Sequence, residues 1–128
     1  MANEEVLTYL QDILDAINDM QSCFVDFPNR YDLFENDIMR RCVVERKVEI
    51  MGEAINRIRK SDASVEIPNA RAIIDTRNRI IHAYDNVQPE FLWSLVIRHI
   101  PELKKDIERI IVIYEEQYNR ENASDNRE

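Results

Sequence analysis

A single glycine, Gly52, and four prolines are the only residues of this 128-residue chain that strongly interrupt regular secondary structure. β-Sandwiches and β-barrels need a turn every few residues, and such turns are rich in glycine and proline. Hydrophobic residues make up 45% of the chain, which is enough for one core at this length. The sequence therefore predicts a single domain built from helices.

Apolar residues recur at intervals of three and four, as expected for amphipathic helices. This spacing predicts helices over about residues 4–24, 33–59, 68–84, 89–96 and 103–114. Pro101 is expected to separate the last two. The predicted fold is an all-α, antiparallel bundle of four to five helices over residues 1–118. Residues 119–128 are almost free of apolar side chains, which predicts a disordered tail.

The composition excludes several classes of protein. No apolar run approaches the roughly 20 residues that a membrane-spanning helix requires. The N-terminus is acidic and amphipathic, unlike a secretory signal. Cys23 and Cys42 form neither a disulfide framework nor a typical zinc-binding spacing. We therefore expect a cytoplasmic protein without a metal ion or cofactor.

The net charge of −8 is unevenly distributed along the chain. Residues 40–82 contain ten Lys/Arg and six Asp/Glu, a local balance of +4, whereas the remaining residues have a balance of −12. A basic middle segment could contact nucleic acid, and acidic ends could contact a protein partner. The pattern also fits an ordinary charged surface.

The stretch TRNRIIHAYD, residues 76–85, lies in a predicted helix and carries unusual side chains. In a helical projection, Arg77 and Tyr84 fall within the apolar stripe formed by four isoleucines: Ile73, Ile74, Ile80 and Ile81. Asn78 and His82 are four residues apart on a separate polar face, so Asn78 could orient the imidazole. Arg77 and His82 therefore share a site only if the helix distorts or a second copy of it contributes.

Arg77 needs an explanation because burying an unpaired guanidinium is costly. One explanation is a structural ion pair with a carboxylate on another helix, the candidates being Glu45, Glu49 and Glu53. The other is that Arg77 lies in a functional cleft, either within one chain or at an interface between subunits. His82 and Tyr84 have ordinary explanations as a solvated residue and a core residue, respectively.

The chain lacks glycine-rich phosphate loops, the HExxH motif and a nucleophile elbow. Arginine and histidine without a metal suit RNA cleavage by the RNA's own 2′-hydroxyl, with histidine transferring protons and arginine stabilising charge on the phosphate. The same residues could also bind a phosphate without cleaving it.

Residues 77–85, RNRIIHAYD, resemble the signature of HEPN domains, in which an arginine and a polar residue are followed by a spacer, a histidine, any residue and a tyrosine. Four residues lie between Arg77 and His82, a spacing similar to that of the HepT-like branch. Other segments resemble the same branch, namely Val44–Ile58 with its Met51-Gly52-Glu53-Ala54 element, Pro68, Phe91–Trp93 and Ile100–Leu103. The resemblance covers about residues 4–114, and it departs at Asn69, where a tryptophan is common.

The resemblance implies a homodimeric helical bundle with two Arg/His motifs at a cleft between subunits. It implies a metal-independent endoribonuclease toxin acting on cellular RNA, neutralised by a nucleotidyltransferase antitoxin of the MNT type. Arg77 and His82 would be catalytic, Asn78 and Arg79 would support the site, and Tyr84 would be adenylylated by the antitoxin. Two alternatives remain: a non-catalytic nucleotide- or partner-binding subunit of a nucleotidyltransferase, and a helical dimer in which Arg77 is purely structural.

Overall fold

The computed structural model describes residues 2–82 and 88–126 of the chain. All regular secondary structure within these ranges is helical, which confirms the predicted all-α fold. In chain order the elements are α1 (Ala2–Ser22), α2 (Tyr31–Glu35), α3 (Ile38–Ser61), α4 (Ala70–His82), α5 (Pro89–Ser94), the π-helical segment η1 (Leu95–His99) and α6 (Ile100–Asn126). None of these helices combines the length and the apolar character needed to cross a membrane.

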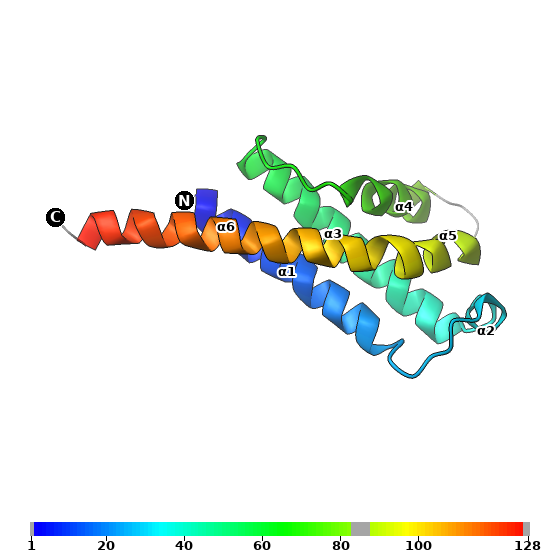
Figure 1. Cartoon of the computed structure of the whole chain (residues 1–128). Coiled ribbons are helices and arrows are strands. Elements are labelled where there is room, and N and C mark those ends of the chain that lie inside the picture. Colours follow the sequence, from blue (N-terminus) through cyan, green and yellow to red (C-terminus); the bar gives the residue numbers. More distant parts are fainter. Residues whose placement is uncertain (1, 83–87, 127–128) are drawn as a thin grey trace.

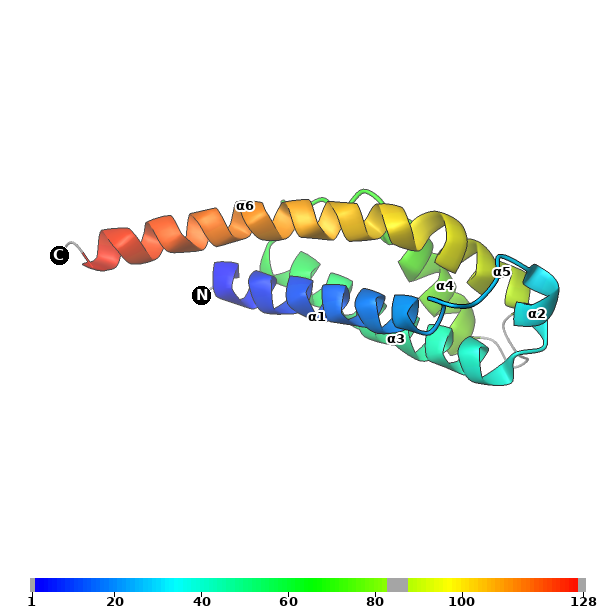
Figure 2. The same cartoon turned by 60° about the horizontal axis from the view of Figure 1, so that its bottom comes forward.

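The long helices pack side by side in an elongated bundle (Figure 1). Helix α1 packs against α3 and α6, and α4 packs against the side of α3. Neighbouring helices run in opposite directions, and α6 extends beyond the others toward the C-terminus (Figure 2). The core is formed by apolar side chains of every helix, including Leu10, Ile17, Phe34, Met51, Ile55, Ile73, Leu92 and Leu103, all with no exposed surface.

The helix predicted over residues 33–59 is in fact two helices, because Asp37 starts a new one. The Asp37 side chain accepts a hydrogen bond from the backbone N–H of Arg40 at 3.0 Å, which is an N-cap interaction. Phe34 in the short α2 is fully buried and anchors that helix to the core. The apolar period continues across the junction, so periodicity alone did not reveal it.

The break predicted at Pro101 is wrong. Helix α5, η1 and α6 follow one another without a gap, and Pro101 lies in the first turn of α6. A proline has no N–H to donate to the carbonyl four residues earlier. The chain adapts through the wider η1 turn, in which the N–H of Ile100 bonds to the carbonyl of Leu95, five residues back.

Helix α6 also continues through Asn126, where the sequence predicted a disordered tail. A side-chain hydrogen bond of 2.8 Å joins Asn3 Nδ2 near the start of α1 to Glu121 Oε1. Contact with α1 thus accompanies helix formation in a segment whose own composition is too polar to indicate a packed helix.

Hydrogen bonds to α6 fix the loop between α3 and α4, and thereby the start of α4. The Tyr114 hydroxyl donates to Asp62 at 2.8 Å. Burial of the hydroxyl, and to a smaller extent the hydrogen bond to and the charge of Asp62, raise the pKa of Tyr114 to about 12. Asp62 also accepts hydrogen bonds from the backbone and side chain of Ser64. At the other end of the loop, Asn69 Nδ2 donates to Asp106 Oδ2 at 2.6 Å.

Candidate active site

Helix α4 carries the Arg/His motif and is held by a buried face formed by Ala70, Ile73 and Thr76. Thr76 satisfies its hydroxyl within the helix, donating to the carbonyl of Ala72 at 2.7 Å. The predicted apolar stripe is only partly correct: Ile74 and Ile80 are half-buried, and Ile81 is 50% exposed. The stripe faces the core at the start of α4 and reaches the surface at its end.

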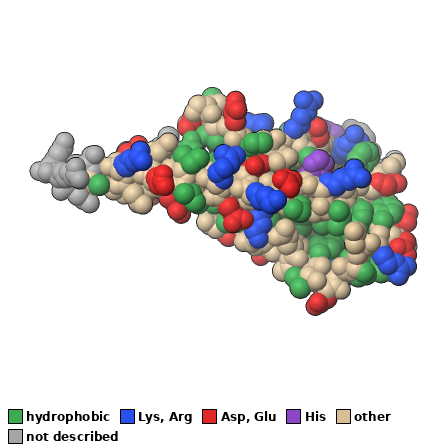
Figure 3. Space-filling model, viewed as in Figure 1, with side chains coloured by type: hydrophobic (Ala, Val, Ile, Leu, Met, Phe, Trp, Pro, Cys, Tyr) green, Lys and Arg blue, Asp and Glu red, His purple; other side chains and the backbone are tan. Residues whose placement is uncertain are grey.

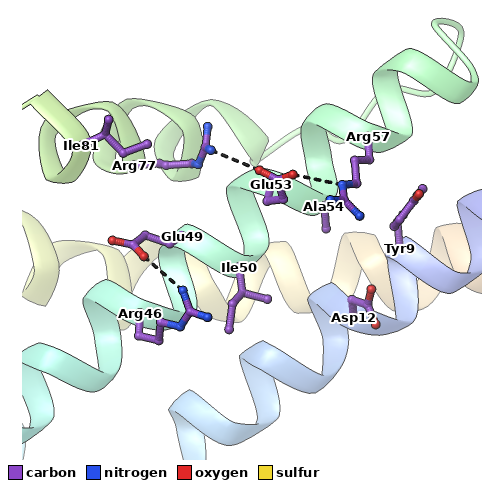
Figure 4. Close-up of a pocket in the computed structure, with 10 residues that line it drawn as sticks. All are labelled: Tyr9, Asp12, Arg46, Glu49, Ile50, Glu53, Ala54, Arg57, Arg77 and Ile81. Carbon is purple, nitrogen blue, oxygen red and sulfur yellow. Dashed lines mark hydrogen bonds and ion pairs between the residues drawn. The ribbon is translucent and has the colours of Figure 1, made fainter.

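Arg77 extends from α4 toward α3, and its side chain is only 21% exposed. Its Nη2 donates to Glu53 Oε2 at 3.3 Å, so Glu53 is the partner among the three candidate carboxylates. Glu49 instead pairs with Arg46 on its own helix at 3.3 Å. The second oxygen of Glu53 accepts from Arg57 Nε at 3.0 Å, so one carboxylate joins two guanidinium groups (Figure 4).

The stem of Arg77 lies directly over Gly52 in α3. A Cβ atom at position 52 would collide with Arg77 Cδ and would lie 3.2 Å from both Cγ and Nε. Glycine inside a helix costs about 1 kcal/mol relative to alanine. The Nε of Arg77 is buried and has no hydrogen-bond partner among the described residues. The guanidinium is therefore deeply seated but incompletely satisfied.

Arg77 borders a groove between α1, α3 and α4 with a cavity volume of about 490 Å³. The groove is lined by Tyr9, Asp12, Arg46, Glu49, Ile50, Glu53, Ala54, Arg57, Arg77 and Ile81. Three arginines are thus balanced by three carboxylates. Acidic and basic side chains are likewise interspersed over the face of the molecule in Figure 3. The excess of basic residues in the middle of the sequence does not become a continuous basic tract on that face.

Asn78, Arg79 and His82 are not among the residues that line this groove. Asn78 and His82 are exposed, as expected for the polar face, and neither lines the groove. Arg79 is exposed and stacks on Phe91, with its guanidinium carbon 4.0 Å from the ring centroid. Among the described residues, His82 therefore does not share the groove that Arg77 borders. Tyr84 lies outside the described residues.

Within residues 2–82 and 88–126 there is no group of three or more histidine, cysteine or acidic residues placed to hold a metal ion. Cys23 and Cys42 are both free thiols. The described part of the motif offers a guanidinium that borders a groove and an imidazole on another face of the same helix. An arginine can stabilise negative charge on a phosphate, and a histidine can transfer a proton.

Sequence reasoning did not identify two features of the groove. The role of Gly52 was missed, although its being the only glycine, and its place inside a helix, were a usable signal. Tyr9 and Arg57 were also missed, and Arg57 lies over the Tyr9 ring at 5.8 Å from its centroid. They belong to different helices, and no local motif links them.

A family model described as "Ribonuclease HepT-like" matches residues 13–110. The chain is 34% identical over 110 residues to "Putative RNase MJ1380" of Methanocaldococcus jannaschii, covering 84% of this chain and 98% of the relative. It is also 34% identical over 109 residues to "Probable ribonuclease HepT" of Thermococcus cleftensis, covering 80% of this chain and 92% of that protein. No solved structure matches the chain significantly.

Proposed function

We propose that this chain, which belongs to the HepT-like ribonuclease family, is a metal-independent endoribonuclease toxin. Its catalytic residues in this proposal are Arg77 and His82. The observation that carries the proposal is the state of Arg77. Its side chain is held in a groove, and it uses one of its five N–H donors on a protein partner among the described residues. The buried Nε is shielded, so the donors offered to an anion are those of the two terminal nitrogens that Glu53 does not use.

The proposed reaction is cleavage of RNA by its own 2′-hydroxyl. The 2′-oxygen attacks the adjacent phosphorus, the bond to the 5′-oxygen breaks, and the products are a 2′,3′-cyclic phosphate and a 5′-hydroxyl. His82 takes the proton from the 2′-hydroxyl or gives one to the leaving 5′-oxygen. Arg77 stabilises the charge on the pentacoordinate phosphate. Asn78 and Arg79 support the site, and Asn78 lies one helical turn from His82.

The proposed site is completed by a second copy of the chain. Arg77 and His82 lie on different faces of α4, so one chain offers each group to a different side. Ile81 lies beside them and is 50% exposed, which an interface would cover. In a two-fold dimer, Arg77 of one subunit would face His82 of the other.

Within this proposal, the activity is controlled in the cytoplasm by a nucleotidyltransferase antitoxin of the MNT type. Its reaction would transfer an adenylyl group from ATP to the hydroxyl oxygen of Tyr84, two residues after His82, with release of pyrophosphate and of the hydroxyl proton. The added phosphodiester would place a negative charge close in sequence to Arg77 and His82 and compete with RNA for them.

A second candidate function is a non-catalytic subunit that binds a nucleotidyltransferase or a nucleotide. The observation that favours it is the charge balance of the groove, in which Glu53 already engages Arg77. This candidate predicts partner binding that survives Arg77→Ala and no RNA cleavage by any variant.

Expression in cells without the antitoxin, combined with cleavage of RNA in excess EDTA, tests the proposal. The wild type is expected to inhibit growth and to leave 2′,3′-cyclic phosphate ends, whereas His82→Ala does neither. Glu102→Gln, which removes an exposed carboxylate from α6, is a matched control expected to behave as the wild type. If neither the wild type nor His82→Ala inhibits growth or cleaves RNA, the ribonuclease function is rejected and the binding-subunit function remains.

A further inference from the structure

Gly52 occupies a position where the backbone does not require glycine. It lies in the middle of the 24-residue helix α3 and is buried. No glycine among the described residues has a positive φ, so a left-handed conformation is not the reason for it. Glycine is unfavourable inside helices, so its presence at this position needs another explanation.

The explanation is space for Arg77. The three atoms nearest to a Cβ built at position 52 all belong to the Arg77 side chain, and none belongs to the backbone of a neighbouring helix. The closest neighbour at this position is therefore the Arg77 side chain and not a helix backbone. An alanine would force the Arg77 stem away from α3, and the guanidinium would move with it.

The next residue holds the far end of the same side chain. Glu53 accepts one N–H of Arg77 at 3.3 Å and the Nε of Arg57 at 3.0 Å. Arg57 is one helical turn farther along α3, and Figure 4 shows the Glu53 carboxylate between the guanidinium groups of Arg57 and Arg77. A carboxylate held from one side offers a fixed acceptor to the guanidinium on the other side.

We propose that Gly52 and Glu53 form a positioning element for Arg77, in which Gly52 sets how deeply the stem is seated and Glu53 sets the orientation of the guanidinium. Both residues act on the RNA phosphate only through Arg77. The inference rests on the proposed function, since it assigns Arg77 to charge stabilisation during cleavage. Misplacing such a group by about 1 Å can reduce a rate by around a hundredfold.

The kinetic test compares Gly52→Ala with wild type and with Arg77→Ala. Gly52→Ala is expected to lower kcat at least about tenfold with KM changed less than about threefold, because the lost interaction belongs to the transition state. In the Arg77→Ala background the same change is expected to have no further effect on kcat. An unchanged kcat for Gly52→Ala, or equal effects in both backgrounds, would overturn the inference.

A stability measurement distinguishes positioning from general damage to α3. Gly52→Ala is expected to raise the melting temperature in the Arg77→Ala background, where the methyl group has room and alanine favours the helix. In the wild-type background the gain is expected to be lost. A loss of stability in both backgrounds would overturn the inference, since the glycine would then serve packing that does not involve Arg77.

Glu53 is tested with a graded pair of variants. Glu53→Ala is expected to lower kcat more than Glu53→Gln, because glutamine keeps one acceptor oxygen for the guanidinium. Glu102→Gln on α6 is again the control, with kcat equal to the wild type. Equal kcat values for Glu53→Ala and wild type would overturn the role of Glu53.

A readout independent of catalysis separates this inference from the proposed function. The Nε–H proton of Arg77 can be followed by nitrogen-resolved NMR, and its burial predicts slow exchange with solvent in the wild type. Gly52→Ala and Glu53→Ala are expected to accelerate that exchange at least about fivefold. Identical exchange in all three proteins would overturn the positioning element, whereas failure of the wild type to cleave RNA would overturn only the proposed function.

Discussion

Arg40 on α3 and Arg77 on α4 both have partly buried side chains, but their donors are used in different ways. The Arg40 side chain is 37% exposed; its Nε donates to the carbonyl of Cys23 at 2.8 Å and its Nη1 to Asp37 at 2.6 Å. Its guanidinium also lies 4.5 Å from the centroid of the Phe27 ring. Arg77 is less exposed, at 21%, yet has one hydrogen bond of 3.3 Å to Glu53 and a buried Nε without a described partner.

We interpret this difference as that between an arginine that holds the fold and one that the proposed function uses for chemistry. Arg40 ties the end of α1 to the start of α3, and its interactions are directed inward. Burying a donor without a partner costs stability, so the state of Arg77 is unfavourable for folding alone. Buried polar groups are normally hydrogen-bonded, so an exception such as Arg77 Nε needs an explanation. Arg41 also has a buried Nε without a partner among the described residues. Its Nη1 donates to the carbonyl of Glu35, and Arg41 does not border the groove.

The largest expected effect is on catalysis by Arg77→Ala. Loss of one charge-stabilising donor group is expected to reduce RNA cleavage about 10²–10³-fold. The free energy of unfolding is expected to change by less than about 1 kcal/mol, because Glu53 keeps its pair with Arg57 in a partly exposed setting. Initial cleavage rates at saturating RNA and urea denaturation check the two parts. Cleavage at the wild-type rate would contradict the contrast with Arg40.

The next effect, on stability, comes from Arg40→Ala. Removing two hydrogen bonds and an aromatic contact is expected to lower the free energy of unfolding by roughly 2 kcal/mol. RNA cleavage below the unfolding transition is expected to stay within about twofold of the wild type, because Arg40 does not border the groove. Urea denaturation and the same cleavage assay measure both quantities. A stable but inactive Arg40→Ala protein would reverse the assignment of the two arginines.

A smaller effect is expected at the structural contact between Tyr114 and Asp62. Tyr114→Phe is expected to cost about 1 kcal/mol, the usual value of a lost hydrogen bond. The pKa of Tyr114 is about 12 in the folded chain and near 10 when unfolded. The unfolded chain therefore releases this proton first, and the contribution to stability is full below pH 10 and is lost between about pH 10 and 12. Alkaline unfolding curves of wild type and Tyr114→Phe should converge across that window, and parallel curves would contradict the role of this contact.

The smallest effect is expected for the ion pair of Arg46 with Glu49. Its N–O distance of 3.3 Å equals that of the Arg77–Glu53 pair, but Arg46 is 70% exposed. Glu49→Gln is therefore expected to change the free energy of unfolding by less than about 0.5 kcal/mol. Double-mutant cycles on both pairs measure the difference that burial makes. Equal coupling energies would show that burial of Arg77 has no energetic consequence.

The sequence predicted the fold well where apolar spacing decides the structure. The residues that form the seam of α1, including Leu10, Ile13 and Ile17, are all fully buried. It failed where a local interaction decides: Asp37 starts a helix inside an unbroken apolar pattern, and Pro101 is accommodated by a π-helical turn. Neither outcome changes the hydrophobic period, so the period could not reveal them.

At the site, the sequence predicted an unusual arginine but could not select its partner. Glu45, Glu49 and Glu53 follow one another at intervals of four residues along one side of α3, and only the register of α3 against α4 identifies Glu53 as the partner. That register depends on packing across the whole bundle. The exposure of His82 followed from its place on the polar face of the helix, whereas its catalytic role stays a prediction.

Subunit complementation tests the central claim, a site shared between two copies of the chain, most directly. Arg77→Ala and His82→Ala chains, each inactive alone, are mixed after mild unfolding and refolded together. A shared site leaves one intact Arg77/His82 pair in each mixed dimer, so random pairing predicts about a quarter of wild-type RNA cleavage. If the mixture stays as inactive as its components while mixed dimers form, the two residues do not act across the interface and the account is contradicted.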